Sequence, residues 1–199
     1  MSEELFFEKF RKVGRMNKLC TITEKIDGTN AQIAFDEEGN FLVGSRQRQI
    51  WPNGTDGMKG CDNQGFAQWV HANHEELFAY LGPGRHYGEW AGSGIQRRYG
   101  MSEKRFYLFN TFRFQTEDNP IPEILSSAGL SVVPIIYEGP FSTEAVERAM
   151  QYLSTNGSSI AVYDNPEGVI IYHHGMRTYS KVTFDFDEGK WSNTVSNTA

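Results

Sequence analysis

A lysine that is followed two residues later by an aspartate and a glycine is the first candidate for chemistry in this sequence. Lys25, Asp27 and Gly28 lie in the stretch EKIDGTN, directly after the β-like residues 19–24. An Asp-Gly pair favours a tight turn, so the spacing predicts Lys25 at a strand end with Asp27 beside it. An ordinary hairpin with a solvated lysine would show the same short pattern. A lysine nucleophile must lose its proton, and this requires desolvation or a neighbouring cation.

Further groups that could bind a nucleotide recur downstream in a fixed order. They lie on or next to successive β-like segments, in SR at 45–46, YGEWAG at 87–92, FYLFN at 106–110, PEGVI at 166–170 and YSKV at 179–182. An arginine fork can hold two phosphate oxygens at once, which a lysine cannot do as well. A carboxylate accepts hydrogen bonds from a sugar hydroxyl, and Mg²⁺ prefers hard oxygen ligands. The series therefore contains groups suited to a phosphate, a sugar and a metal ion.

The ordered series resembles the covalent nucleotidyltransferase superfamily, which contains polynucleotide ligases and mRNA capping enzymes. Within it, EKIDGTN and GEWAGSGIQ most resemble the phage type-2 RNA ligases and the RNA-editing ligases. The resemblance covers about residues 20–184. It implies an ATP-dependent polynucleotide ligase that most resembles enzymes joining RNA ends, with ATP and Mg²⁺ (or Mn²⁺) as cofactors. It implies three steps, which are formation of a covalent lysyl-AMP, transfer of AMP to a 5′-phosphate, and attack by a 3′-hydroxyl.

The resemblance also assigns catalytic roles to residues that match family motifs. It implies that Lys25 is the nucleophile and that Asp27 orients it. Lys181 is implied to bind the α-phosphate, and as a nearby cation it would favour loss of the Lys25 proton. Glu167 is implied to coordinate the divalent metal ion, which would offset charge on the phosphates.

Other matches imply contacts with the nucleotide. The backbone of Glu24 is expected at the adenine, Arg46 at the ribose and phosphate, and Glu89 at the ribose hydroxyl. Phe109 is implied to stack on adenine. The alternation of residues 106–110 is also what a buried strand shows, so packing in a core remains open for Phe109.

A last set is implied to contact the polynucleotide. In the RNA-ligase branch the Asn30 position is linked to sealing, and Gln96 could reach the same nucleotide or the strand end. The basic side chains would follow the phosphate backbone; they are Arg46, Arg48, Arg97 and Arg98. Taken alone, each of these residues could instead belong to a turn, a cap or a solvated face.

The chain departs from the family pattern near its C-terminus. Thr183 stands where the last motif usually has a second lysine, and Asn110 stands where an aspartate is common. About 15 residues follow the last motif. We therefore expect a minimal enzyme, or one with an accessory protein in place of the usual C-terminal domain. The alternatives are a minimal single-domain ATP-dependent DNA ligase that seals nicks, and a non-catalytic module that binds nucleotides or nucleic-acid ends.

Composition restricts the setting of this chemistry. The chain has 199 residues, a formal net charge of −6, 39% hydrophobic residues and 14% aromatic residues. This composition excludes a wholly disordered chain and does not indicate a strongly basic nucleic-acid binder. Cys20 and Cys61 are too few for a disulfide framework, and there is no secretory signal or spanning apolar run. We expect a cytoplasmic monomer whose partner is RNA or a nicked duplex, with no membrane partner.

Short β-like segments separated by Gly, Asn and Asp turns must position these residues. Helical spacing occurs at 4–12, 65–80 and 142–154, the last opened by Ser142 or Thr143. Strands are predicted at 19–24, 31–36, 40–44, 85–91, 105–112, 131–137, 159–163, 168–173 and 178–184. Strands outnumber helices without strict alternation, which favours an α+β fold. With the resemblance, we expect one nucleotidyltransferase (ATP-grasp-like ligase adenylation) domain at 1–185, built from antiparallel sheets flanked by helices, and a frayed tail at 186–199.

Overall fold

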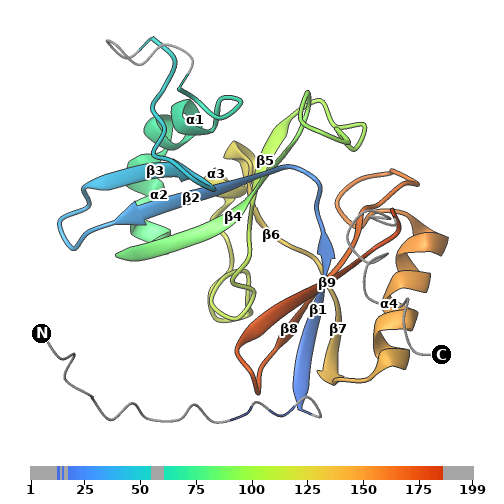
Figure 1. Cartoon of the computed structure of the whole chain (residues 1–199). Helices are drawn as coiled ribbons and strands as arrows, with labels where there is room; N and C mark the ends of the chain where they lie inside the picture. Colours follow the sequence, from blue (N-terminus) through green and yellow to red (C-terminus); the bar gives the residue numbers. More distant parts are fainter. Residues whose placement is uncertain (1–12, 14, 16–17, 55–60, 186–199) are drawn as a thin grey trace, which may run out of the picture.

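Two β-sheets meet at the short segment that follows Lys25. The computed structural model describes residues 13, 15, 18–54 and 61–185 (Figure 1). One sheet has the strand order β3 (Phe41–Ser45), β2 (Thr29–Phe35), β4 (Gly84–Gly92), β5 (Lys104–Leu108) and β6 (Leu130–Val132). The other has the order β7 (Ile135–Pro140), β1 (Leu19–Lys25), β8 (Gly168–His173) and β9 (Thr178–Thr183). Neighbouring strands are antiparallel except β5 and β6, which are parallel.

The larger core lies between the five-stranded sheet and helices α1 (Phe66–Ala72) and α2 (His74–Leu81). Because successive side chains of a strand point to opposite faces, Trp90 of β4 and its register partner Phe106 of β5 share the face that packs on α1. The ring of Phe66 lies 5.4 Å from that of Trp90 and 4.9 Å from that of Phe106. The same alternation turns Glu89 and its partner Tyr107 to the opposite face.

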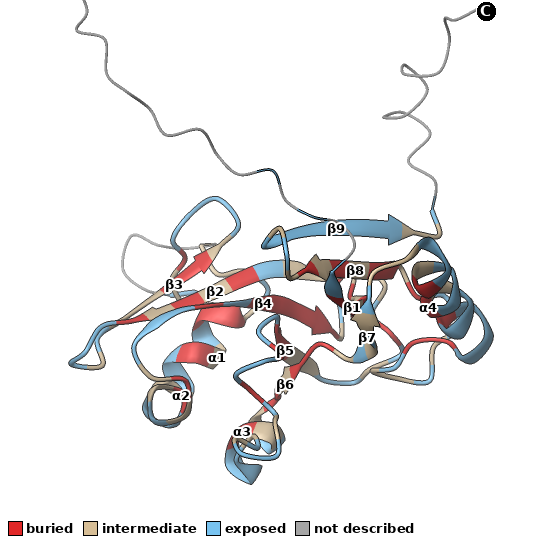
Figure 2. Ribbon diagram, turned by 90° about the horizontal axis from the view of Figure 1, so that it is seen from below, coloured by how far each residue is buried: buried red, intermediate tan, exposed pale blue. Residues whose placement is uncertain are grey.

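The smaller core lies between the four-stranded sheet and helix α4 (Thr143–Asn156). Ala145, Ala149 and Leu153 recur at helical spacing and pack against Ile22 of β1 and Ile171 of β8. The Oγ of Ser142 accepts a hydrogen bond from the N–H of Ala145 at 3.1 Å, which caps the helix as the sequence predicts. Figure 2 shows buried residues in α4 and β8, and β9 exposed along the sheet edge. Only one face of this sheet is thus covered by α4.

The α+β class and the antiparallel-rich sheets flanked by helices are as the sequence predicts. Seven of the predicted strands correspond to β1–β5, β8 and β9, although β5 ends at Leu108 rather than at 112. A short helix, α3 (Glu123–Ala128), was not anticipated from the sequence pattern. The helix expected at 4–12 and the tail at 186–199 lie outside the described residues.

Three predicted elements are wrong, each for a local reason. The helix at 65–80 is two helices, because Asn73 has φ −128° and ψ 18° and its side-chain amide donates to Trp69 O. The strand at 131–137 is divided between the two sheets around Pro134, which has no N–H for a ladder. Residues 159–163 form no strand, because the Ser159 N–H binds the Glu24 carboxylate. Within the described residues, no helix is long and apolar enough to cross a membrane.

Candidate active site between the two sheets

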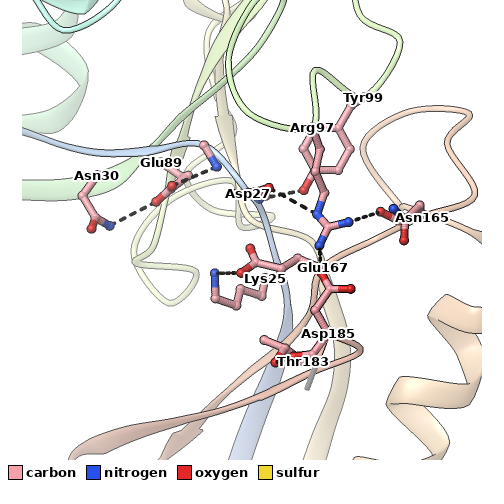
Figure 3. A network of polar contacts seen from close by, with 11 residues as sticks. Lys25, Asp27, Asn30, Glu89, Arg97, Tyr99, Asn165, Glu167, Thr183 and Asp185 are labelled. Carbon is pink, nitrogen blue, oxygen red and sulfur yellow. Dashed lines mark hydrogen bonds and ion pairs between the residues drawn. The ribbon is translucent and has the colours of Figure 1, made fainter. Parts of the chain in front are cut away.

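Lys25 and Glu167 form an ion pair where β1 and β8 run side by side. Lys25 is the last residue of β1 and lies opposite Gly168, the first residue of β8, so Glu167 immediately precedes its partner. The Nζ of Lys25 lies 2.5 Å from the Oε1 of Glu167 (Figure 3), and both side chains are about one-fifth exposed, at 21% and 17%. Gly168 is required there, because it has φ +145° and a Cβ would lie 2.1 Å from Val182 O.

Asp27 lies next to Lys25 and is held by Arg97 from the loop between β4 and β5. The Nε of Arg97 is 3.2 Å from Oδ2 of Asp27, within ion-pair distance but not aligned for a hydrogen bond. The same guanidinium pairs with the carboxylate of Asp185 and donates to Asn165 O at 3.3 Å. Arg97 therefore connects the segment after β1 to the chain just beyond β9 (Figure 3).

The loop that carries Arg97 adopts an unusual backbone. Gln96, Arg98 and Tyr99 have φ values of +43°, +59° and +51°, a region that side-chain-bearing residues rarely occupy. Tyr99 is buried, and its hydroxyl accepts a hydrogen bond from the N–H of Asp27 at 2.6 Å. Burial raises the pKa of the Tyr99 hydroxyl, so it stays protonated. Backbone strain of this kind gathers at functional sites.

Glu89 lies on the β4 face that points toward Lys25. Its Oε1 accepts a hydrogen bond from the Gly28 N–H and its Oε2 one from the Asn30 side-chain amide, both at 3.1 Å. A Cβ on Gly28 would lie 2.5 Å from Trp90 O, so only glycine allows this approach. Burial raises the pKa of Glu89 to about 7, and Lys25 opposes that shift only partly.

Glu24 points to the other side of β1 from Lys25. Its buried carboxylate accepts hydrogen bonds from Ser158 Oγ at 2.5 Å and from the Ser159 N–H at 2.7 Å. Burial raises the pKa of Glu24, while these hydrogen bonds oppose the shift. Its own N–H donates to Pro134 O at 3.0 Å. The side chain of Glu24 thus anchors the end of β1 that carries Lys25.

A cavity of about 570 Å³ lies beside Glu24. Its lining includes Tyr107, Pro134, Ser159 and Ile160. Tyr107 is the register partner of Glu89, and Ser159 and Pro134 both contact Glu24, so the cavity adjoins two of the predicted site residues. Its size lies within the range of pockets that bind small molecules.

Glu167 is also the best candidate metal ligand. Its Oε2 is buried and has no hydrogen-bond partner in the described structure. The described residues contain no group of three or more His, Cys, Asp or Glu side chains arranged to hold a metal ion. Mg²⁺ bound with a nucleotide usually uses one or two carboxylates, the phosphates and water, so a single unpartnered carboxylate oxygen suits it.

The other predicted residues are less closely joined to this cluster. Lys181 of β9 lies opposite Ile170 of β8, so its side chain is on the same face of the sheet as Lys25. Phe109 comes directly after β5, and its side chain is 38% exposed. Five of the predicted residues have exposed side chains that make no hydrogen bond or ion pair with Lys25, Asp27, Glu89 or Glu167 in the described structure. They are Arg46, Arg48, Gln96, Arg98 and Lys181. Arg97, predicted to follow a polynucleotide backbone, is instead engaged with two carboxylates.

Several residues of the site were not predicted from the sequence. Tyr99, Asp185, Ser158 and Ser159 carry no motif, and each contacts a motif residue far away in the chain. The glycines at 92, 94 and 100, in the stretch GSGIQRRYG, could have indicated an irregular loop here. Thr183 lies opposite Gly168, and its hydroxyl donates to Asp185 O at 3.0 Å, so it shapes the turn that brings Asp185 to Arg97.

Solved structures with a similar fold are forms of an RNA ligase from Naegleria gruberi. They are a mutant with ATP and Mn (15% identity, TM-score 0.58), a mutant with AMP and Mn (17%, 0.57) and an apo mutant (16%, 0.55). Each match covers 84% of this chain and 50% of the other, so the chain spans about half the length of these structures. A comparison with curated proteins gives no match.

A family model described as RNA ligase matches residues 18–190. The match includes every residue of the Lys25 cluster and both sheets. The chain belongs to the RNA ligase family.

Proposed function

We propose that this chain is an ATP-dependent RNA ligase that seals 5′-phosphate and 3′-hydroxyl ends, of the branch that contains the phage type-2 and RNA-editing ligases. The observation that carries the proposal is the Lys25–Glu167 ion pair, flanked by Asp27 and Glu89. It gathers a nucleophile, a metal-ligand candidate and a sugar-binding carboxylate at one junction. Residues 1–185 form the nucleotidyltransferase domain of this proposal.

The first step forms a bond between Lys25 and AMP. The neutral amine attacks the α-phosphorus of ATP, a P–N bond forms, the bond to the bridging oxygen breaks, and pyrophosphate leaves. Lys25 loses protons in the process, and Asp27, fixed by Arg97 and Tyr99, orients the amine. A divalent metal ion at Glu167 would supply charge neutralisation on the phosphates.

The second and third steps use the same site. An oxygen of the RNA 5′-phosphate attacks the AMP phosphorus, the P–N bond breaks, and Lys25 recovers its amine. The 3′-hydroxyl then attacks the activated 5′-phosphate, loses its proton and displaces AMP. Asn30, held by Glu89, and the exposed Arg46, Arg48, Gln96 and Arg98 are the proposed contacts with RNA.

Nucleotide binding is assigned to the surroundings of Lys25. Glu89 accepts from the ribose hydroxyl, and Lys181 contacts the α-phosphate from β9. Adenine binds at the cavity beside Glu24, and Phe109, which lies in the chain between the lining residues Tyr107 and Thr111, is the proposed stacking ring. ATP and Mg²⁺ or Mn²⁺ are the cofactors of the proposal. The chain acts as a monomer in the cytoplasm, and an accessory protein provides additional contacts with RNA.

Sealing assays test the substrate. Nicked duplexes that differ only in RNA or DNA next to the nick, and single-stranded RNA, are incubated with ATP and Mg²⁺. The proposal expects faster sealing where the ends are RNA, and no sealing by Lys25→Ala. Equal rates with DNA would favour a minimal DNA ligase, and tight ATP binding without sealing would favour a binding module.

A further inference from the structure

Four aromatic rings cluster on the face of the four-stranded sheet opposite α4. Tyr172 of β8 lies 4.8 Å from Tyr179 of β9 and 5.1 Å from His174, measured between ring centroids. Phe112, from the loop after β5, lies edge-on against His174 at 5.0 Å. These four residues are called the aromatic face below. The four rings contact one another in series and come from β8, β9, the turn between these strands and the loop after β5.

Two rings of the aromatic face are exposed to solvent, and the other two, Tyr172 and His174, are half-buried. Tyr179 is 63% exposed and Phe112 is 54% exposed, whereas Ile171 and His173, which point to the other side of β8, are buried. Clustered exposed rings of this kind mark an interaction surface more often than isolated ones do. In the described structure, the sheet core under α4 is complete without these two rings, since they lie on its far side.

Strand register connects the aromatic face to the catalytic lysine. Three rows of residues cross β1, β8 and β9 on this face. The first is Lys25, Gly168 and Thr183, the second is Thr23, Ile170 and Lys181, and the third is Thr21, Tyr172 and Tyr179. At about 3.3 Å per residue, the third row lies about 13 Å from the first. That distance is about four stacked steps of a nucleic-acid strand, at about 3.4 Å each.

The chemistry of the three rows fits a single strand of RNA. Bases stack on aromatic side chains with little dependence on sequence, and a cation near the strand compensates its phosphates. Lys181 lies in the row between the aromatic face and Lys25. Glu138 is opposite Thr21 and already accepts a hydrogen bond from its hydroxyl, so this carboxylate is engaged within the protein.

We propose that the aromatic face stacks bases of the single-stranded RNA segment about four nucleotides from the end being sealed. The proposal rests on the proposed function, because it places the reacting end at Lys25. The binding surface lies on β8, β9 and the loop after β5, and three of its four rings, Phe112, Tyr172 and His174, lie outside the sequence motifs.

Binding of a short single-stranded RNA tests the surface without requiring catalysis. The RNA carries a 5′-phosphate and a fluorescent adenine analogue four nucleotides from that end, and quenching is followed in the full chain. Tyr179→Ala and Phe112→Ala should weaken binding about tenfold each, as expected for loss of one stacked base. Tyr179→Phe should restore affinity, because stacking needs the ring and not the hydroxyl. Tyr152→Ala is the matched control, since Tyr152 is 48% exposed on α4, away from this face.

The outcomes separate this proposal from the proposed function. Weaker binding and lost quenching in the two alanine variants, with Tyr152→Ala unchanged, support the aromatic face. Unchanged affinity in Tyr179→Ala and Phe112→Ala overturns it, as does an equal loss in Tyr152→Ala. Sedimentation that shows these two variants changing the oligomeric state would also overturn it, in favour of a second copy of the chain. Sealing by the unmodified chain is scored separately, so the failure of one proposal leaves the other standing.

Discussion

The Nζ of Lys25 lies 2.5 Å from the Oε1 of Glu167, and the second oxygen of this carboxylate is buried without a hydrogen-bond partner among the described residues. The same carboxylate thus contacts the amine of Lys25 through one oxygen and leaves its other oxygen unpartnered in the described structure. A divalent metal ion held by Glu167 would compete with Lys25 for this carboxylate and would neutralise charge on the phosphates.

Removal of the metal ion or of its ligand should abolish the first step. Glu167→Gln keeps the size of the side chain but loses the charge, and we expect lysyl-AMP to form at least about 100-fold more slowly, because metal assistance contributes several kcal/mol. Chelation of the metal should have the same effect on the unmodified protein. Glu147→Gln, at an exposed site on α4, is the control. A normal rate in Glu167→Gln would refute the metal assignment.

Substitution of Arg97 should slow lysyl-AMP formation more than substitution of its exposed partner Asp185. Arg97→Ala leaves the carboxylate of Asp27 without its cation, and we expect lysyl-AMP formation to slow by about 10- to 100-fold, the range of a lost partly buried charge contact. Asp185 is 72% exposed, so Asp185→Asn should cost less than about threefold. Single-turnover rates with ATP measure both, with Arg85→Ala on β4 as a control. Equal effects of the two variants would contradict this order.

The hydroxyl of Tyr99 should stabilise the turn after Lys25. Tyr99→Phe leaves the N–H of Asp27 without its acceptor, which should lower the free energy of unfolding by about 1–2 kcal/mol. Tyr163→Phe is a matched control, because the Tyr163 ring packs 5.1 Å from that of Tyr99 and its hydroxyl makes no hydrogen bond within the described residues. Urea unfolding measures both variants. An equal loss in both would show that ring packing, not this hydrogen bond, is responsible.

Glu89 should make the protein less stable as the pH rises. Burial raises its pKa to about 7 in the folded chain, from an ordinary value of 4.5, so the folded state binds more protons than the unfolded state between these values. The stability contributed by this group is complete below about pH 4.5 and is lost by about pH 7, a change of about 3 kcal/mol.

Glu89→Gln should remove this dependence. The free energy of unfolding of the variant, relative to that of the unmodified protein, should increase from about pH 5 to about pH 8. Urea unfolding at several pH values measures the difference, with Glu147→Gln expected to show a flat profile. A difference that does not change with pH would mean that the Glu89 pKa is not raised.

Three of the residues named from the sequence lie near one another at the junction of the two sheets. Lys25, Glu89 and Glu167 belong to the ordered series of motifs. Each of these motifs contains a glycine at a place where a Cβ would not fit, namely Gly28, Gly88 and Gly168. The contacts of Tyr99 with Asp27 and of Arg97 with Asp185 could not be predicted. They join residues 72 and 88 positions apart in the chain, and Tyr99 and Arg97 lie in a loop with positive φ angles. No local pattern encodes such a contact.

The errors in the fold have the same origin. A continuous apolar helical face at 65–80 does not reveal that Asn73 turns its amide onto Trp69 O and ends α1. Apolar residues at 131–137 fit a single strand, but Pro134 passes the chain from one sheet to the other and accepts the Glu24 N–H. In both places a polar contact with a specific partner overrides the periodicity.

The most direct test is the intact mass of the protein after incubation with ATP and Mg²⁺. A gain equal to one AMP is expected in the unmodified chain, and none in Lys25→Ala; the mass before ATP is added shows whether the chain is already adenylylated. Persistence of the adduct in Lys25→Ala, or an unmodified chain that gains no AMP and carries none beforehand, would contradict the assignment of Lys25 as the nucleophile.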